Sequence, residues 1–383
     1  MIDIVDKIDC CGCSACVQIC PQNCIAMEED DEGFLYPKVY VTDCVDCGLC
    51  EKVCPVINRF SSSHVQGSFA CFTNDENVRS TSSSGGILHE ISKFVFAKGG
   101  VMYGACFDEK WEVYHGCADN IVDAVKFRGS KYVQSKIGNV YRDIRSILKK
   151  GQKVLFVGTP CQVSGLNHFL QKKYDNLIAI DIVCHSVPSP KVWRYYLNEI
   201  SNHNPITNVI FRSKKNGWKN YSIKIDSNNK ILVHEGKEQN LYMRGFLADL
   251  YTRPSCSACP ARNFTSGSDL TIGDFWGCEK YYPTLDFDKG SSIVLVNTDK
   301  GNKLFKNIKN IFVVQIPYEQ VEPFGLHRPL TSSSKPHYNR KYFFAKMSVA
   351  KSIRFLIFRC VIVLEVKRTV KHILNRYLKK HEK

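Results

Sequence analysis

Two cysteine-rich units of the same spacing near the start of the chain constrain its fold more than any other feature. The first unit runs from Cys10 to Pro21 and the second from Cys44 to Pro55. Both follow the pattern C-x2-C-x2-C-x3-C-P, in which thiolates two residues apart reach neighbouring irons of one 4Fe–4S cluster. A proline cannot continue a helix, so the fourth cysteine of each unit swings away from the other three. The sequence therefore predicts two 4Fe–4S clusters in one small domain.

The two units are expected to exchange their last ligand, because the fourth cysteine of such a unit binds the cluster of the other one. One cluster then takes Cys10, Cys13, Cys16 and Cys54, and the other takes Cys44, Cys47, Cys50 and Cys20. A single copy of the pattern would also suit a four-ligand zinc site, but two intact copies with both prolines favour iron–sulfur clusters. Cys11 and Cys24 lie outside the pattern, and we interpret them as spare thiols packed beside the clusters.

The remaining chain is long enough for a larger second domain. The sequence has 383 residues, of which 44% are hydrophobic, so it can bury a sizeable core. Its 19 cysteines cluster in metal-type spacings, and no signal peptide is visible, which favours metal binding over disulfides. No apolar run approaches the ~18 residues of a membrane span. We therefore expect a cytoplasmic protein.

A Ser-rich stretch divides the sequence into parts. We expect a domain with two 4Fe–4S clusters of the ferredoxin type over residues 1–60, a linker over 61–67, a catalytic domain over 68–335 and a basic amphipathic helical tail over 336–383. Within the catalytic domain, residues 153–183 predict a strand–helix–strand unit, and residues 251–278 are expected to form a loop. The predicted fold class is therefore α+β or mixed α/β, with a small ferredoxin-like domain before a larger α/β domain.

Charge is distributed unevenly along the chain. Residues 1–62 hold 4 Lys+Arg and 11 Asp+Glu, a net charge of −7, whereas residues 336–383 hold 13 Lys+Arg and 2 acids, a net charge of +11. Apolar tail residues recur at helical spacing: Val363, Val366, Val370, Ile373 and Tyr377. Such a helix could lie on the inner face of an anionic membrane. Docking of the helix on the protein's own body or on a partner explains the pattern equally. No nucleic-acid recognition module accompanies the charge.

Two short segments of the catalytic domain suit a phosphate. The Ser/Gly-rich turn from Ser82 to Gly86 precedes a predicted helix, where backbone N–H groups can bind an anion, although an ordinary helix cap explains it as well. In the segment from Gly129 to Ser135, Lys131 and Ser135 can also meet a phosphate, whereas a surface turn is the simpler interpretation.

Four further cysteines suggest a third metal site. Cys161 opens a predicted helix after one strand, and Cys184 follows the next strand, so both fall at the carboxyl edge of a parallel sheet. The Cys256-x-x-Cys259 pair must fold over that edge to complete a 4Fe–4S or zinc site. A nucleophilic Cys161, with its pKa lowered by the helix N-terminus, is the rival hypothesis.

The order of these motifs, together with Ser268 to Gly277, resembles the coenzyme F420 hydrogenase/dehydrogenase beta-subunit family over residues 65–330. The resemblance implies an FAD-binding domain that holds its own 4Fe–4S cluster on Cys161, Cys184, Cys256 and Cys259. It implies FAD contacts at Ser83, Ser84, Gly85, Gly86, Lys131, Tyr132, Gln134, Ser135 and Thr159. Ser186 departs from the glycine of the family pattern, and nothing in the sequence identifies a deazaflavin pocket or the substrate.

Two residues are candidates for catalysis. His185 suits a proton relay near a flavin nitrogen, and a histidine that only hydrogen-bonds its loop is the alternative. Asp274 and Trp276 suit a substrate face, or else a structural turn. We expect an FAD-dependent iron–sulfur oxidoreductase that takes electrons from a redox partner protein or soluble carrier and acts on a small-molecule substrate. A non-catalytic electron-transfer subunit and a structural or regulatory iron–sulfur protein are the alternatives.

Overall fold

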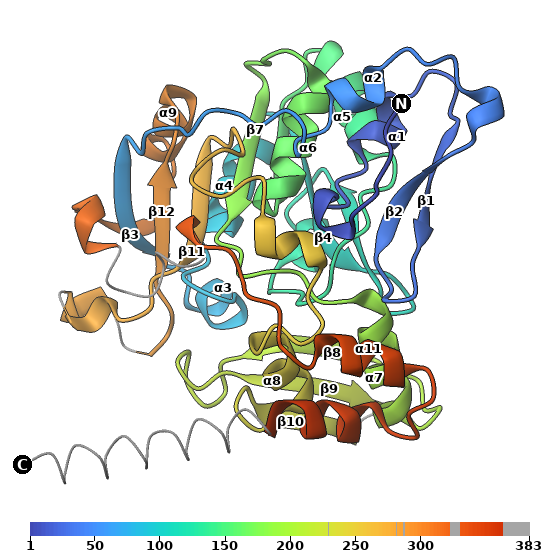
Figure 1. Cartoon of the computed structure of the whole chain (residues 1–383). Coiled ribbons are helices and arrows are strands. Elements are labelled where there is room, and N and C mark those ends of the chain that lie inside the picture. Colours follow the sequence, from blue (N-terminus) through green and yellow to red (C-terminus); the bar gives the residue numbers. More distant parts are fainter. Residues whose placement is uncertain (229, 281, 286–287, 322–329, 363–383) are drawn as a thin grey trace, which may run out of the picture.

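The computed structural model of the chain describes residues 1–383 except 229, 281, 286–287, 322–329 and 363–383. Its described strands form three sheets, with two, three and eight strands. The small cysteine-rich head lies beside the eight-stranded sheet, and the three-stranded sheet forms a separate layer at one end of it (Figure 1). The mixed α/β fold expected from the sequence is therefore confirmed.

The head consists of short elements arranged around its cysteines. The hairpin of β1 (Ile25–Glu29) and β2 (Leu35–Val39) separates helix α1 (Ala15–Ile19) from helix α2 (Leu49–Lys52). Each helix begins after a residue with positive φ, Ser14 at 62° and Gly48 at 70°. These turns let the chain bend sharply inside each cysteine unit, which places consecutive thiols around a common centre.

The large sheet has the strand order β13-β3-β12-β11-β7-β6-β4-β5. Its centre is parallel: β4 (Val101–Phe107), β6 (Val154–Gly158), β7 (Leu177–Ile182) and β11 (Leu270–Asp274) run the same way. Antiparallel strands flank it: β5 (Val113–Ala118), β12 (Ser292–Val296), β3 (Gly67–Thr73) and β13 (Ile311–Ile316). The carboxyl ends of the four parallel strands therefore meet at one edge, where ligands bind in such sheets.

Helices cover both faces of this sheet. On one face, α5 (Val140–Lys149) and α6 (Pro160–Leu170) pack with β4, β6 and β7. On the other face lie α4 (Ile87–Phe96) and α9 (Asp299–Lys306), and α3 (Glu76–Thr81) follows β3. The parallel strands are apolar on both sides, as in β6, where all five residues are buried. Burial on two faces explains why these strands could be predicted from continuous hydrophobic runs.

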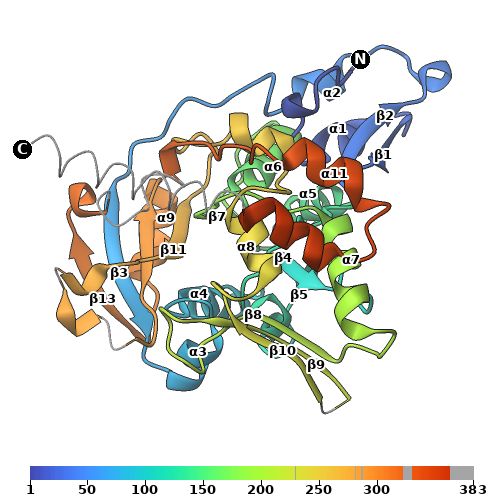
Figure 2. The ribbon, with the colours of Figure 1, turned by 60° about the horizontal axis from the view of Figure 1, so that its bottom comes forward.

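The three-stranded layer combines β8 (Asn208–Ser213), β9 (Ser222–Ser227) and β10 (Lys230–Gly236) with α7 (Pro190–Ser201), α8 (Leu241–Leu247) and α11 (Arg340–Met347). The turned view shows these helices gathered on one side of the molecule (Figure 2). The described part of the predicted tail joins this core through Phe343, Ile357 and Cys360. The amphipathic stripe from Val363 to Tyr377 lies outside the described residues.

One expectation about secondary structure is wrong. The region 251–278 contains β11, which pairs in parallel with β7 and antiparallel with β12. The strand Leu270–Asp274 is short and ends in Gly-Asp, so its own sequence favours a turn, and only its two neighbours in the sheet make it a strand. Among the described residues, no helix is long and apolar enough to cross a membrane.

Candidate functional site

The head contains two hollows lined by cysteines. The first is lined by Cys10, Cys11, Cys13, Cys16 and Cys54, and the second by Cys20, Cys24, Cys44, Cys47 and Cys50. Each hollow thus combines three cysteines of one unit with the fourth cysteine of the other, as the spacing predicts. Cys24 lies 3.4 Å from Cys20, sulfur to sulfur, in the second hollow. The structure therefore brings together both predicted ligand sets, each with one extra thiol.

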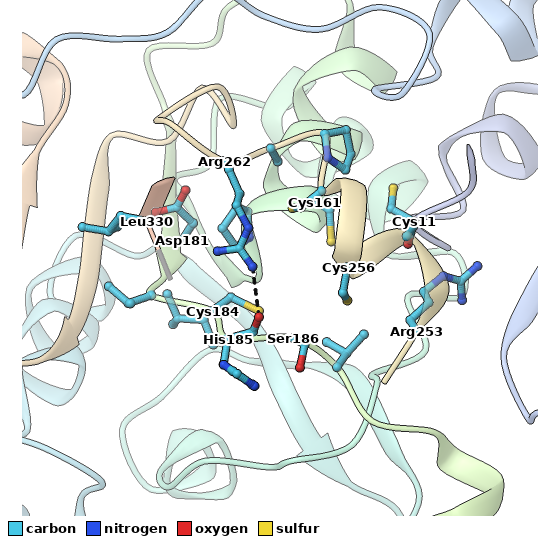
Figure 3. Close-up of a pocket in the computed structure, with 18 of the residues that line it drawn as sticks. Cys11, Cys161, Asp181, Cys184, His185, Ser186, Arg253, Cys256, Arg262 and Leu330 are labelled. Atoms are coloured by element: carbon cyan, nitrogen blue, oxygen red, sulfur yellow. Dashed lines mark hydrogen bonds between the residues drawn. The ribbon is translucent and has the colours of Figure 1, made fainter. Parts of the chain in front are cut away.

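A third hollow gathers the cysteines of the catalytic body. It is lined by Cys161, Cys184, Cys256 and Cys259, and also by Cys11 of the head (Figure 3). Cys161 lies in the first turn of α6, whose N-cap Thr159 forms a capping box with Gln162. Cys184 lies just beyond the end of β7. The four predicted cysteines of this site are therefore together at the carboxyl edge of the sheet.

The CxxC pair reaches this edge because its segment is hydrogen-bonded to the chain that follows Cys184. The amide of Arg253 donates to the carbonyl of Val187 at 2.9 Å, and the amide of Ser189 donates to the carbonyl of Tyr251 at 3.0 Å. The 3-10 turn Pro254–Ala258 then carries Cys256, and Cys259 follows it.

The chemistry of the third hollow fits a cationic centre. Burial raises the pKa of Cys256 to about 12 and that of Cys259 to about 11. Burial, together with repulsion from the neighbouring thiols, also holds the pKa of Cys184 well above its usual range. Four thiolates are stable here only beside positive charge, which iron or zinc supplies. In the part of the chain that is described, no three His, Cys, Asp or Glu side chains are arranged so that they could hold a single metal ion.

Arg253 lies between the first and third hollows and is fully buried. Its Nη2 donates to the sulfur of Cys10 at 3.6 Å, and its Nε donates to the carbonyl of Cys10 at 2.8 Å. The same side chain lines the third hollow (Figure 3). The pKa of Arg253 is raised because the attraction of Cys10 and Tyr36 outweighs the burial that opposes its charge. Arg253 thus places one positive charge between two sets of thiols.

Cys11 links the same two hollows, because it lines both of them. A hydrogen bond with Cys11 is the main cause that raises the pKa of Cys161. The contact is close on the body side too, since a Cβ on Gly165 of α6 would lie 2.7 Å from the Cβ of Cys13. Cys11, which the sequence suggested to be a spare thiol, therefore lies at the junction of head and body.

A larger cavity of about 470 Å³ lies between the carboxyl edge of the large sheet and the three-stranded layer. Its volume is in the range of small-molecule and cofactor sites. Cys184 and His185 line both this cavity and the third hollow. Seven of the nine residues implied as FAD contacts also line it: Ser83, Ser84, Gly86, Lys131, Tyr132, Ser135 and Thr159.

The two predicted phosphate segments meet at one end of the cavity. The amide of Ser130 donates to the hydroxyl of Ser83 at 2.7 Å. Helix α4 begins there after Gly86 without a side-chain cap, so its first two amides, those of Ile87 and Leu88, can meet an anion. Burial lowers the pKa of Lys131 to about 7, and its Nζ donates to the carbonyls of Lys126 and Arg128. This end of the cavity can hold a phosphate through backbone amides and through the ammonium of Lys131, which gains or loses its charge near pH 7.

Two residues of the implied set lie elsewhere. Gly85 packs against the strands, since a Cβ would lie 2.6 Å from the carbonyl oxygen of Cys71. Gln134 lies at the contact between head and body, where its amide donates to the carbonyl of Cys11 at 3.2 Å and accepts from Arg253 at 3.0 Å. Both lie outside the lining of the cavity.

His115 is a cavity residue that the sequence did not reveal. Its Nδ1 lies 2.6 Å from the hydroxyl of Ser135, and its Nε2 lies 3.1 Å from the carbonyl of Val157. The carbonyl only accepts, so Nε2 carries the proton and Nδ1 accepts from Ser135. Burial lowers the pKa of His115 to about 4, which keeps the ring neutral. His115 lies within strand β5, and its local sequence gives no functional signal.

The two candidates for catalysis both lie on the cavity wall. His185 has Nε2 3.1 Å from Oδ1 of Asp249, and its carbonyl accepts from Arg262 at 3.0 Å (Figure 3). Asp274, at the end of β11, is engaged by the guanidinium of Arg212. The backbone of His185 is therefore fixed by Arg262 and its ring lies beside a carboxylate, whereas Asp274 is one half of an ion pair.

Comparison with known proteins identifies both parts of the chain. Residues 9–58 match the model of a 4Fe–4S dicluster domain, and residues 151–318 match the C terminus of the coenzyme F420 hydrogenase/dehydrogenase beta subunit. The second match covers less than half of the chain, so the body over residues 151–318 is similar to the C terminus of that beta subunit. The chain thus combines an iron–sulfur head of the dicluster type with a body similar to part of an oxidoreductase subunit.

Among solved structures, the chain is similar to a chain of the F420-reducing NiFe hydrogenase complex from Methanosarcina barkeri. The two share 13% sequence identity with a TM-score of 0.45, over 77% of this chain and 94% of that chain. No curated protein sequence matches the chain.

Proposed function

We propose that this protein is an FAD-dependent iron–sulfur oxidoreductase. Electrons move between the two clusters of the head, a third 4Fe–4S cluster on Cys161, Cys184, Cys256 and Cys259, and FAD in the cavity of about 470 Å³. FAD supplies the chemistry that pairs single electrons and exchanges them with an organic substrate or deazaflavin-like coenzyme as a hydride.

The observation that carries this proposal is the continuity of the sites. Cys11 lines both the first hollow of the head and the third hollow, and Cys184 with His185 lines both the third hollow and the cavity. Neighbouring sites thus share a wall. Such contact suits transfer of single electrons from the head to a group bound in the cavity.

The protein's own residues have distinct tasks under this proposal. Ser83, Lys131 and the first two amides of α4 bind the phosphates of FAD. Neutral His115 holds Ser135 in place. Asp249 lies 3.1 Å from Nε2 of His185, where its carboxylate can pair with the protonated ring that a proton relay requires.

An anaerobic count of iron, sulfide and flavin tests the proposal directly. Three clusters give about twelve irons per chain together with one FAD, whereas the head alone gives about eight. The double variant C256S/C259S is expected to lose about four irons and to keep the head clusters. C117S is a matched control, because Cys117 lies on β5 outside all three hollows.

Three outcomes would overturn parts of the proposal. Eight irons in the wild-type chain, unchanged in C256S/C259S, would remove the third cluster. Protein that carries twelve irons but binds no FAD would remove the flavin. Zinc in place of the last four irons would turn the third hollow into a structural zinc site.

A non-catalytic electron-transfer subunit is the second candidate, because Cys47 of the second hollow is exposed to solvent. A cluster with an exposed ligand is accessible for the exchange of electrons with a separate protein. Reduction of bound FAD without turnover of any deazaflavin or enone acceptor, together with a tightly bound partner enzyme, would favour this role.

A further inference from the structure

Three buried polar atoms on one wall of the cavity have no partner among the described residues. Arg212 on β8 and Asp274 on β11 form an ion pair through Nη1 and Oδ2. The side chain of Arg212 is only 3% exposed, yet its Nε and Nη2 make no hydrogen bond, nor does Oδ1 of Asp274. Both residues line the cavity. The pair thus offers donors and an acceptor that its own ion pair does not use.

Aromatic packing around Arg212 does not satisfy these donors. Its guanidinium lies over the rings of Tyr221 at 4.5 Å and Trp276 at 5.1 Å from the ring centroids. Trp276 in turn stacks on Trp218 at 4.3 Å. Stacking engages the flat faces of a guanidinium, whereas its N–H groups point outward in the plane. Buried charged donors without partners are costly, so this edge is built for a ligand or for water.

The free edge of Arg212 has the geometry of an oxyanion site. Nε–H and Nη2–H are parallel donors that match the two oxygens of a carboxylate or phosphate. Among the charged Lys, Arg, Asp and Glu side chains of the lining, Arg128, Lys131 and Arg212 are basic and only Asp274 is acidic, which gives a formal excess of two positive charges. Trp276 is half-buried and lines the cavity beside this pair of donors, which we call the fork of Arg212.

We propose that Arg212 binds the carboxylate of an organic-acid substrate, which places its planar part beside Trp276. This inference rests on the proposed function and names the substrate class of the same cavity. Oδ1 of Asp274 accepts a hydroxyl or N–H group of that substrate. The pyrophosphate of FAD is the other source of an oxyanion for this fork, and the experiment separates the two.

Benzoate and its neutral analogue benzamide are suitable probes, because they share a flat ring and differ in the carboxylate. Their dissociation constants are measured by calorimetry on the full chain, both FAD-loaded and FAD-free. We expect the wild type to prefer benzoate. Arg212→Gln should raise the dissociation constant of benzoate by about tenfold or more, because a bidentate charged contact is lost. The dissociation constant of benzamide should not change.

Two further variants separate recognition from folding. Asp274→Asn keeps the fork and removes the neighbouring negative charge, so it should bind benzoate at least as tightly as the wild type. The double variant R212Q/D274N leaves no buried charge without a partner, so it tests the loss of the fork in a chain with an intact neutral pair. It should also lose the preference for benzoate while its thermal unfolding stays close to that of the wild type.

The outcomes are distinct. Loss of benzoate binding in R212Q with FAD affinity changed less than about threefold supports the substrate carboxylate. Loss of FAD affinity in R212Q, with benzoate excluded from the FAD-loaded protein, assigns the fork to the cofactor and overturns the substrate class. Equal binding of benzoate and benzamide by the FAD-free wild type shows that water fills the site and overturns the proposal. Absence of FAD binding in the wild type would instead contradict the proposed function.

Discussion

Arg253 offers a direct test of the contact between the head and the body. Its guanidinium donates to the sulfur of Cys10 at 3.6 Å and lines the third hollow. We predict that replacing it with methionine, which keeps the length of the side chain and removes its charge, lowers the midpoint potential of the cluster at Cys10. A nearby cation stabilises the reduced state, which carries one more negative charge, so its removal must shift the potential downward.

The size of the shift follows from this distance. Two unit charges 3.6 Å apart interact by about 5 kcal/mol at an effective dielectric constant near 20. An electron added to a cluster is spread over all its atoms, so about half of this value acts on the couple. About 2 kcal/mol corresponds to roughly 100 mV for a one-electron couple. Arg253→Lys keeps the charge and should shift the potential by less than about a third of that amount.

A potentiometric titration followed by electron paramagnetic resonance measures the shift in each variant. Arg340→Met is the matched control, because Arg340 also joins head to body, through Glu32 and the carbonyl of Thr252, and contacts no cysteine. Its potentials should equal those of the wild type. An equal shift in both methionine variants, or no shift in Arg253→Met with its iron content intact, would refute an electrostatic role for Arg253.

Three further predictions concern packing and protonation. Gly165→Ala places a methyl group 2.7 Å from the Cβ of Cys13, so it should lower the free energy of unfolding in urea by about 1–3 kcal/mol and reduce the iron content. Wild-type values of both quantities would contradict the close contact. Affinity for FAD should fall as pH rises through about 7, where Lys131 loses its charge, and Lys131→Met should abolish this slope in fluorescence titrations. His115 is protonated more readily when unfolded, so stability should fall by about 3 kcal/mol between pH 6.5 and 4, and thermal unfolding of His115→Gln should show a smaller loss.

The parts of the site that the sequence could predict are those determined by local spacing. The prolines after Cys20 and Cys54 redirect the chain within a few residues, so the exchange of the fourth ligand could be inferred without tertiary information. Strand β6 is apolar in all its positions, and its burial on two faces left a continuous hydrophobic signal. The placement of Cys161 and Cys184 at one edge then followed from the parallel connection.

The contacts that the sequence could not predict join residues far apart in the chain. Arg253 reaches Cys10 across 243 positions, and Arg212 reaches Asp274 across 62. Neither arginine differs in local pattern from an ordinary surface residue. Their roles depend on where the head docks and where the three-stranded layer closes on the sheet, which no periodicity encodes. Strand β11 was missed for the same reason, since its neighbours in the sheet determine its conformation.

The docking of the head also determines which of its ends can meet another molecule. Cys11 lines both the first and the third hollow, and Gly165 of α6 lies against Cys13, so the first hollow faces the body. Cys47 of the second hollow is exposed to solvent. Under the proposed function, an electron carrier therefore meets the second cluster first, and the first cluster is the step before the body. The two units have the same spacing in the sequence, and only the docked structure makes one an outer site and the other an inner site.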